Sequence, residues 1–265
     1  MRSVVPELLH PSQHCGMPEN TIFDAVAAIQ DAIADAETTH RPLCVVSLDL
    51  KEAFDRISHK YLWTIMRSYG FREGFVERTA MMYDNATSSV QINSQLSTPI
   101  QFRCGVRQGC LLSMTLFALC LNPLLYYLDK RLNGISARGR QRKTTVIAYA
   151  EDVSILMTSK DEVEIIREAI KCYQKAKGAK LNIEKSSVLA VGNWDTSCDV
   201  MGIPYREEIT VLGVKRKITV KKSALASWTK LTAMVRTQAR RAYSRDLNMA
   251  QRITYVQTCL LSKLW

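Results

Sequence analysis

The sequence predicts an α+β fold, with a mixed, largely antiparallel sheet backed by helices. The first observation is the order of the expected elements, which runs strand, helices, strand pair, helix, acidic hairpin, helix and strand. The second is residues 144–158, where two apolar runs flank Tyr149-Ala-Glu-Asp152, a pattern typical of two short strands with an acidic pair at the bend. The third is an apolar run that ends at Asp49, which indicates a buried strand.

The first part of the chain is expected to form helices on either side of the Asp49 strand. Asn20 or Thr21 can cap the first helix. Ser58 begins the second helix, which Gly70 ends. A short helix then leads to two strands of alternating pattern. The apolar positions that mark these elements are, in order, Ile22, Val26, Ile29 and Ile33; Leu62, Ile65, Met66 and Tyr69; Phe75, Met81 and Met82; and Val90, Ile92, Ile100 and Phe102.

The second part begins with a glycine-bounded loop at residues 105–109, followed by a long helix that opens near Ser113. Pro123 is expected to kink this helix. After the acidic hairpin, residues 159–162 have the sequence of a capping box, and Gly178 ends the helix that follows. The remaining expected elements are a strand at residues 188–191, a hairpin at 209–220 and a basic helical segment that runs to Trp265.

Composition narrows the classes of function. The 265 residues include 36 basic and 25 acidic side chains, and the formal net charge of +11 suits a polyanionic partner. The eight cysteines form no CxxC pair, so we expect a reducing compartment rather than a zinc site or a disulfide framework. The longest apolar run, at residues 116–128, is too short to span a bilayer, and the N-terminus lacks the apolar segment of a signal peptide. We therefore expect an intracellular protein, cytoplasmic or nuclear or both, with no membrane partner.

The acidic residues indicate a metal site. An acidic pair at a hairpin tip is, by itself, usually part of a solvated loop. Here Asp49 stands at the end of a buried strand, and Glu151 and Asp152 would lie on a hairpin beside it. Such a set of carboxylates can hold two divalent cations that clamp a phosphoryl group during in-line displacement.

Five blocks of the sequence, taken together, resemble the reverse transcriptase of non-LTR (LINE-type) retrotransposons. Each block is weak alone, but their order and spacing are specific, and the resemblance runs from about Pro11 to about Lys217. The blocks are Ser47-Leu-Asp-Leu-Lys-Glu-Ala-Phe-Asp55, Gly105-Val-Arg-Gln-Gly-Cys-Leu-Leu-Ser113, Tyr149-Ala-Glu-Asp152, Gly178-Ala-Lys-Leu-Asn-Ile-Glu-Lys185 and Val211-Leu-Gly-Val214. The second of these is similar to the family's GxxQGxxLS block, and the third stands where the family has YADD.

The resemblance implies a fold and a domain order. The fold is the palm of a right-handed polymerase, with partial fingers and the start of a helical thumb. Residues 1–43 would be partial fingers, residues 44–217 the palm with the remaining fingers elements, and residues 218–265 the start of the thumb. The domain would be truncated at both ends, because the family's upstream basic strands are missing and the thumb stops at Trp265.

The implied activity is RNA-directed DNA synthesis by two-metal nucleotidyl transfer, with an RNA template, a DNA primer and dNTP as partners. Asp49, Glu151 and Asp152 would be the catalytic ligands of two Mg²⁺ ions, with the Leu50 carbonyl as an optional addition. Lys185 matches the lysine that would protonate the leaving pyrophosphate. An exposed lysine without a role is the alternative for Lys185, and the oligomeric state is left open.

The resemblance also implies residues that contact substrates. Phe54 falls where the family carries an aromatic ring that occludes a ribose 2′-hydroxyl. Gln108 and Gly109 would lie, with Gly105, against the incoming nucleotide and the template. The alternatives are that Phe54 is only a core residue and that the glycines serve only the backbone of the loop. The C-terminal basic helices would follow phosphates, with a merely solvated face as the alternative.

Departures from the family pattern bear on activity. Glu151 replaces the first aspartate of the YADD-type motif, and Leu111 and Met114 stand where the family usually has prolines. Together with the missing segments, these departures leave a second hypothesis, a catalytically inactive, truncated remnant that at most binds nucleic acid. A nucleotide cyclase built on a similar palm is a weaker third hypothesis, because the sequence has no GGDEF-like hairpin.

Overall fold

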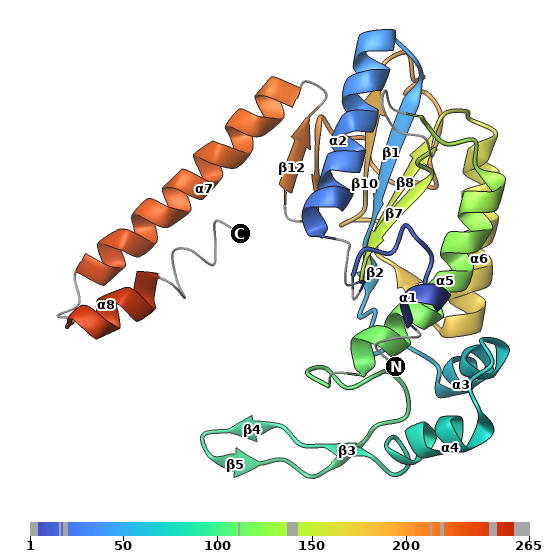
Figure 1. The fold of residues 1–265 in the computed structure, drawn as a ribbon, viewed down its shortest axis with the longest axis vertical. Coiled ribbons are helices and arrows are strands. Elements are labelled where there is room, and N and C mark those ends of the chain that lie inside the picture. Colours follow the sequence, from blue (N-terminus) through green and yellow to red (C-terminus); the bar gives the residue numbers. More distant parts are fainter. Residues whose placement is uncertain are drawn as a thin grey trace.

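The computed structural model describes residues 5–15, 17, 21–110, 112–136, 143–212, 214–217, 220–243 and 248–256. Helices and strands are interleaved along the chain, as the sequence predicts (Figure 1). The helices are α1 (Val5–Leu8), α2 (Ile22–Thr39), α3 (His59–Ser68), α4 (Glu73–Met81), α5 (Ser113–Arg131), α6 (Glu162–Lys177), α7 (Val220–Tyr243) and α8 (Met249–Tyr255). The strands are β1 (Leu43–Leu48), β2 (Leu50–Lys51), β3 (Thr87–Ser88), β4 (Gln91–Ile92), β5 (Gln95–Leu96), β6 (Ile100–Gln101), β7 (Val146–Tyr149), β8 (Asp152–Met157), β9 (Lys180–Leu181), β10 (Ser187–Val191), β11 (Glu208–Val211) and β12 (Val214–Lys217).

The centre of the fold is a four-stranded sheet in the order β10-β1-β8-β7, and every neighbouring pair in it is antiparallel. Among the described residues, parallel pairing is limited to isolated bridges such as that between Gln13 and Ala148. The sheet is therefore the largely antiparallel one that the sequence predicts. β1 lies between β10 and β8, so the strand that leads to Asp49 is hydrogen-bonded on both sides.

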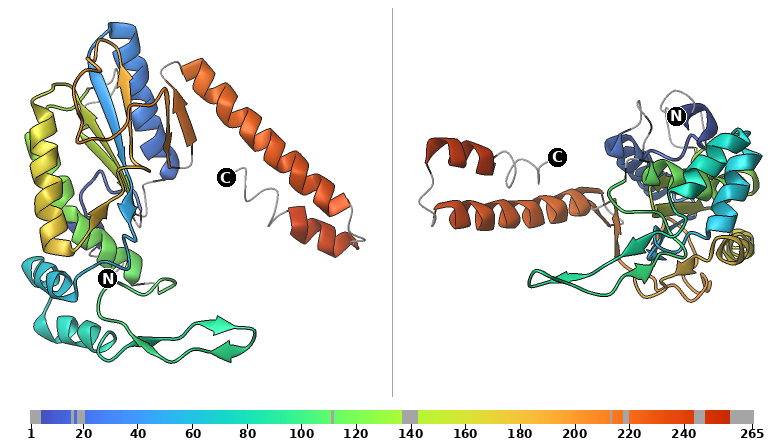
Figure 2. Two further views of the ribbon diagram at one scale, coloured as in Figure 1. Left: turned by 180° about the vertical axis from the view of Figure 1, so that it is seen from behind. Right: turned by 90° about the horizontal axis from the view of Figure 1, so that it is seen from below.

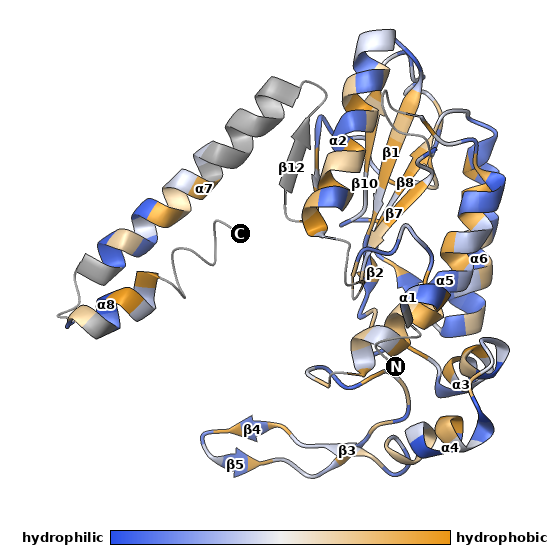
Figure 3. Ribbon diagram, viewed as in Figure 1, coloured by the Kyte–Doolittle hydropathy of each residue, from blue (hydrophilic) through white to orange (hydrophobic). Residues whose placement is uncertain are grey.

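Helices cover both faces of this sheet. α2 lies on one face, and α5 and α6 lie on the other (Figure 1). The side chains of β1 alternate between the two resulting cores, since Val46 packs with α5 and α6 while Val45 packs with α2. Because both faces are covered, β1 is apolar at every position except Ser47 and does not alternate. Figure 3 shows this apolar character along β1 and β8.

Most helix ends follow the sequence signals. Thr21 caps α2 in a capping box with Asp24, and Ser58 caps α3. Gly178 ends α6 with a φ of 84°, in the left-handed region that glycine adopts without strain. α5 runs through Pro123 as a single helix.

The capping box predicted at residues 159–162 forms only in part: the Glu162 carboxylate accepts the Ser159 N–H at 2.9 Å, but the Ser159 hydroxyl accepts the Asp161 N–H instead of the Glu162 N–H. α6 begins at Glu162 itself, and the residue before it makes no side-chain capping bond. The Glu162 side chain is buried, and its carboxylate accepts the backbone N–H groups of Asn133, Thr158 and Ser159. Glu162 thus ties the start of α6 to the ends of α5 and β8, because a buried carboxylate needs several donors around it.

The two alternating strands expected near Val90 and Ile100 are also corrected. The structure has four two-residue strands, β3 to β6, in a hairpin that projects from the body of the fold (Figure 1). Alternation predicts a strand with one buried face, but Val90, Ile92 and Ile100 are 52%, 67% and 59% exposed. The apolar side chains of the pattern are therefore exposed, and no described part of the chain covers them.

The C-terminal hairpin is shorter than expected, because β12 ends at Lys217 and α7 begins at Val220. Figure 2 shows that α7 and α8 stand away from the sheet. The expectation that the chain stops within a helix at Trp265 lies outside the described residues, as does Leu111. Of the helices that the structure describes, none is both long enough and apolar enough to cross a membrane.

Candidate active site

β7 and β8 form the predicted acidic hairpin, in which Tyr149 pairs with Asp152 and the bend consists of Ala150 and Glu151. Ala150 has a φ of 52°, in the left-handed region that few non-glycine residues adopt. The buried side chain of Gln13 holds this bend. Its Oε1 accepts the Ala150 N–H at 3.1 Å, and its Nε2 donates to the Ala150 carbonyl at 3.5 Å. The position of the acidic pair is therefore fixed from the N-terminal segment.

Asp49 follows β1, and the register of the sheet places it beside the hairpin. The last residue of β1 pairs with Val153 of β8. In an antiparallel pair the next residue of one strand lies opposite the preceding residue of the other, so Asp49 lies opposite Asp152. Hydrogen bonds also hold the Asp49 backbone, because its N–H donates to Ser186 Oγ at 3.0 Å and its carbonyl accepts the Asn182 N–H at 2.9 Å.

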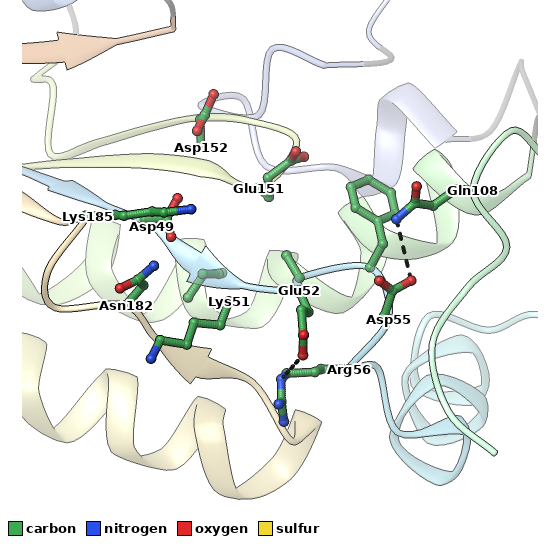
Figure 4. Close-up of a pocket in the computed structure, with 13 residues that line it drawn as sticks. Asp49, Lys51, Glu52, Asp55, Arg56, Gln108, Glu151, Asp152, Asn182 and Lys185 are labelled. Carbon is green, nitrogen blue, oxygen red and sulfur yellow. Dashed lines mark hydrogen bonds and ion pairs between the residues drawn. The ribbon is translucent and has the colours of Figure 1, made fainter. Parts of the chain in front are cut away.

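These residues line an open cavity of about 490 Å³ (Figure 4). The cavity brings together every residue that the sequence placed in the site except the two glycines Gly105 and Gly109, which belong to the same loop as the lining residue Gln108. Its walls come from four of the five sequence blocks, which lie far apart along the chain. The lining residues are Asp49, Leu50, Lys51, Glu52, Ala53, Phe54, Asp55, Arg56, Gln108, Glu151, Asp152, Asn182 and Lys185.

Three of the carboxylates that line the cavity, those of Asp49, Glu151 and Asp152, interact unfavourably. Partial burial raises the pKa of Asp152 above its usual value, and the negative charges of Glu151 and Asp49 raise it further. In Figure 4 the three side chains point in different directions. Among the described residues, no set of three or more His, Cys, Asp and Glu side chains is gathered closely enough to hold a metal ion as it stands. The chemistry of the set still suits a hard cation, because its ligand atoms are carboxylate oxygens.

Phe54 lies between the core and the cavity. Its ring stacks on Phe117 of α5, with 4.4 Å between the ring centroids and 20° between the ring planes. The same side chain lines the cavity and is only partly buried. Phe54 is therefore packed against the core and also accessible to a ligand, so the two roles considered for it are compatible.

The glycine-bounded loop packs on the segment that carries Phe54. The N–H groups of Gly105 and Val106 donate to carbonyls of that segment, at 2.7 and 2.9 Å. A Cβ on Gly105 would come within 2.6 Å of the Asp55 carbonyl oxygen, so a side chain does not fit unless the backbone moves. Gly105 therefore has a structural role. Gln108 reaches the same segment, with its Nε2 donating to Asp55 Oδ1 at 3.5 Å.

Several lining residues received no role from the sequence. Lys51, Asp55 and Asn182 stand inside the recognised blocks, and that membership was the signal available for them. Arg56 lies just beyond the first block and forms an ion pair with Glu52, with 3.0 Å between the nitrogen and the oxygen. Lys51, Arg56 and Lys185 place basic groups beside the acidic ones in the cavity, as suits a site for a metal-bound polyphosphate.

Residues 2–215 match the sequence model of the family described as "Reverse transcriptase (RNA-dependent DNA polymerase)". The chain belongs to the reverse transcriptase family. Its relatives include the "Transposon TX1 uncharacterized 149 kDa protein" of Xenopus laevis, which is 38% identical over 73% of this chain and 15% of that protein. They also include the Pol polyprotein of the type-2 retrotransposable element R2DM of Drosophila melanogaster, which is 24% identical over 72% of this chain and 18% of that protein.

Solved structures share the fold of this reverse transcriptase domain. An apo telomerase from Candida tropicalis, truncated from its C-terminal domain, aligns with a TM-score of 0.57 at 16% identity, over 82% of this chain and 42% of that one. The polymerase palm predicted from the sequence is confirmed. The domain is of the kind found in the TX1 and R2 non-LTR retrotransposons, and it spans less than a fifth of those two relatives. The family consists of nucleotidyltransferases that generally depend on metal ions.

Proposed function

We propose that this domain catalyses RNA-directed DNA synthesis, in which dNTP is joined to a DNA primer on an RNA template. The observation that carries the proposal is the single cavity shared by Asp49, Glu151 and Asp152. The same cavity is lined by Phe54 and Lys185, from two other blocks of the sequence. An acidic wall beside a basic one suits a reaction in which a metal-bound triphosphate meets a hydroxyl nucleophile.

The proposed cofactors are two Mg²⁺ ions, held by Asp49, Glu151 and Asp152 with the Leu50 carbonyl as an additional ligand. When bound, Mg²⁺ supplies activation of the primer hydroxyl and neutralises charge on the leaving pyrophosphate. The repulsion that raises the pKa of Asp152 supports this assignment, because a cation among the carboxylates would relieve it. The three carboxylates point in different directions in this structure, so their side chains would have to turn to hold the ions together.

Substrate contacts are proposed for the other wall of the cavity. Lys185 is exposed there and can give a proton to the leaving pyrophosphate. Phe54 would exclude a ribose 2′-hydroxyl, and Gln108 would lie along the incoming nucleotide. Gly109, proposed to face the template, has a φ of 81°, and a Cβ built on it would have no neighbour within 4 Å among the described residues. The space beside Gly109 is therefore open to a ligand.

We also propose the domain order of partial fingers at residues 1–43, palm at 44–217 and thumb from 218 onward. The position of α7 and α8 away from the sheet supports a separate thumb (Figures 1 and 2). Parts of the thumb segment, from residue 257 in particular, lie outside the described residues. The cysteines that the structure describes are free thiols, which supports work in a reducing compartment, the cytoplasm or the nucleus.

Nucleic-acid binding without catalysis is the second candidate function. The observation that favours it is Glu151, which carries its carboxylate one methylene further out than aspartate does. A basic chain with a misplaced metal ligand would still hold phosphates, because that attraction depends on net charge and not on the geometry of the metal site.

Primer extension tests the proposed function. The purified chain, given a poly(rA) template, an oligo(dT) primer, dTTP and MgCl₂, should elongate the primer. Asp49→Asn and Asp152→Asn should each abolish elongation. Glu184→Gln is the matched control, because Glu184 is an exposed acid next to Lys185 that does not line the cavity, and it should leave elongation unchanged.

Two outcomes would change the conclusion. If the unaltered chain binds primer–template in a filter assay but elongates nothing, the binding function replaces the polymerase function. If elongation survives both aspartate substitutions, the cavity is not the active site.

A further inference from the structure

Lys177 is a buried lysine whose ammonium contacts aromatic rings. It is the last residue of α6, its side chain is fully buried, and its Nζ has no hydrogen-bond partner among the described residues. Instead it meets two aromatic rings, with Nζ 4.0 Å from the ring centroid of Phe117 and 5.1 Å from that of Tyr173. An unpaired buried ammonium is costly, and a cation–π contact is the compensation that this site offers.

Phe117 connects this lysine to the candidate active site. The ring of Phe117 stacks on the ring of Phe54, which lines the cavity. An aromatic ring has two faces, and because Phe54 covers one of them, Lys177 lies over the other. The three side chains form a stack that runs from the core to the cavity wall where the sugar of a nucleotide would lie.

The backbone at the end of α6 contacts the segment that follows Phe54 in the chain. The Ser58 N–H donates to the Lys177 carbonyl at 2.9 Å. A Cβ on Gly178 would come within 3.1 Å of the Arg56 carbonyl oxygen, so the two segments are in close contact. Closely packed elements transmit strain. A change in the Lys177 side chain should therefore alter the packing of the aromatic rings rather than move α6.

We propose that Lys177 is a positioning residue for sugar discrimination: its ammonium holds the Phe117 ring, and that ring sets the position of Phe54 against the nucleotide. The proposal rests on the proposed function, because it concerns the role given there to Phe54. An uncharged side chain of the same length fills the same space without attracting the face of the ring. Phe117 then gains freedom, and Phe54 closes less completely on the 2′ position of the sugar.

The charge on Lys177 can be switched within an accessible pH range. Burial lowers the pKa of Lys177 to about 8, while the negative charge of Glu151 acts in the opposite direction. Tyr173 on its own helix also lies against the ammonium, and Tyr61 of α3 interacts in turn with Cys120 and Tyr173. Burial raises the pKa of Cys120, Tyr173 and Tyr61, so these three groups stay neutral where the lysine titrates.

Lys177→Met tests the proposal, with dTTP and UTP compared in single-nucleotide primer extension. We expect the ratio of kcat/KM for dTTP over UTP to fall about threefold to tenfold, chiefly because UTP is used better. The Tm should stay the same or rise, because the variant buries no charge. Lys175→Met is the matched control, since Lys175 is exposed on the same helix, and it should leave the ratio unchanged.

A double variant that also carries Phe54→Ala separates positioning of Phe54 from a general effect on packing. If Lys177 acts through Phe54, adding Lys177→Met to Phe54→Ala should leave the ratio at the value of Phe54→Ala alone. A further fall in the double variant would mean that Lys177 acts on discrimination by another route, which would overturn the proposal.

A chain that extends no primer would defeat the proposed function, and the stack is then tested without catalysis. Fluorine NMR of para-fluorophenylalanine at position 54 reports the surroundings of that ring. In the otherwise unaltered chain the resonance should move with a midpoint near pH 8, and in Lys177→Met it should not move. Identical pH behaviour in the two proteins, or an unchanged ratio in an active Lys177→Met protein, would overturn the proposal.

Discussion

The side-chain amide of Gln13 binds both backbone polar groups of Ala150, across a sequence separation of 137 residues. The neighbouring backbone joins the same strand, because Ala148 donates to the Ser12 carbonyl and accepts the His14 N–H, each at 2.8 Å. The N-terminal segment therefore extends the edge of the sheet beside β7 and stabilises the left-handed bend at Ala150. Since the bend carries the acidic pair, this contact contributes to the geometry of the candidate metal site.

Gln13→Ala should destabilise the fold and reduce activity by more than the loss of folded protein explains. The substitution removes the hydrogen bonds of Gln13 to the Ala150 N–H and carbonyl, and a buried polar group left unsatisfied costs about 1–3 kcal/mol. Urea unfolding gives the stability, and primer extension by the fraction still folded gives the activity. Gln91→Ala, in the exposed hairpin, is the control and should change neither. Equal unfolding midpoints for the two variants would show that the contact does not hold the bend.

The pKa of Asp152 implies a dependence of stability on pH and on metal. The raised pKa means that the folded chain holds this proton more tightly than the unfolded chain does. The resulting stabilisation is present at low pH and is lost as the pH rises through the folded-state value. In EDTA, Asp152→Asn should therefore raise Tm relative to the unaltered chain at pH 7 and have less effect at pH 5.

Added MgCl₂ should reverse the order at pH 7, because a bound cation would neutralise the repulsion among the carboxylates. The unaltered chain should gain Tm with MgCl₂, and Asp152→Asn should gain less. Glu184→Gln serves as the control for a general charge effect. The same Mg²⁺ response in Asp152→Asn and the unaltered chain would remove Asp152 from the set of metal ligands.

The core of the candidate site could be predicted from the sequence because it depends on strand ends. Asp49 ends one apolar run and Asp152 begins another, and when adjacent strands are antiparallel such residues meet at the same edge of the sheet. Periodicity also placed α2, α3 and α5, since each buries an apolar stripe against the sheet or a neighbouring helix.

Other features could not be predicted because they depend on contacts between distant segments. A lysine in the last turn of a helix, like Lys177, is ordinarily a solvated group that favours the helix dipole. Its burial between α5 and α6 follows from how these helices pack, and the same is true of the Gln13 contact. In the β3–β6 hairpin the alternation of Val90 and Ile92 shows which face is apolar, but whether anything covers that face is not a local property.

Phe54→Ala should allow ribonucleotides to be used. Removal of the ring opens the space that a 2′-hydroxyl needs, so UTP incorporation should rise about tenfold or more relative to dTTP. Phe23→Ala is the matched truncation, because Phe23 is 59% exposed on α2 and lies outside the cavity. Primer extension with each nucleotide measures the ratio, and an unchanged ratio in Phe54→Ala would refute the assignment.

Binding to single-stranded nucleic acid should be weak, independent of sequence and steeply dependent on salt. The net charge is +11, and Arg236 and Arg240 are exposed on α7. The logarithm of the affinity should fall with the logarithm of salt concentration, with a slope near −0.7 for each phosphate neutralised. Arg236→Ala and Arg240→Ala should each reduce this slope by about 0.7 if each arginine neutralises one phosphate, while Thr232→Ala should not. A flat response in filter binding would contradict the prediction.

Glu151→Asp should increase polymerase activity. Glutamate keeps the charge of aspartate but carries its carboxylate one methylene, about 1–1.5 Å, further from the backbone. Mg²⁺ requires near-ideal octahedral geometry at about 2.0–2.1 Å, so the site cannot absorb that displacement unless an ion moves. A misplacement of about 1 Å can cost roughly 100-fold in rate, or about 2.7 kcal/mol of barrier.

Primer extension should therefore be slow in the unaltered chain and at least about tenfold faster in Glu151→Asp. The gain should appear in kcat rather than in KM for dTTP, because the displaced ligand affects the reacting geometry more than the binding of the nucleotide base and sugar. Glu184→Asp makes the same chemical change outside the cavity and should give no gain. Fast extension by the unaltered chain would show that the bend at Ala150 already compensates for the longer side chain, since it is the backbone that sets where the Glu151 carboxylate can reach.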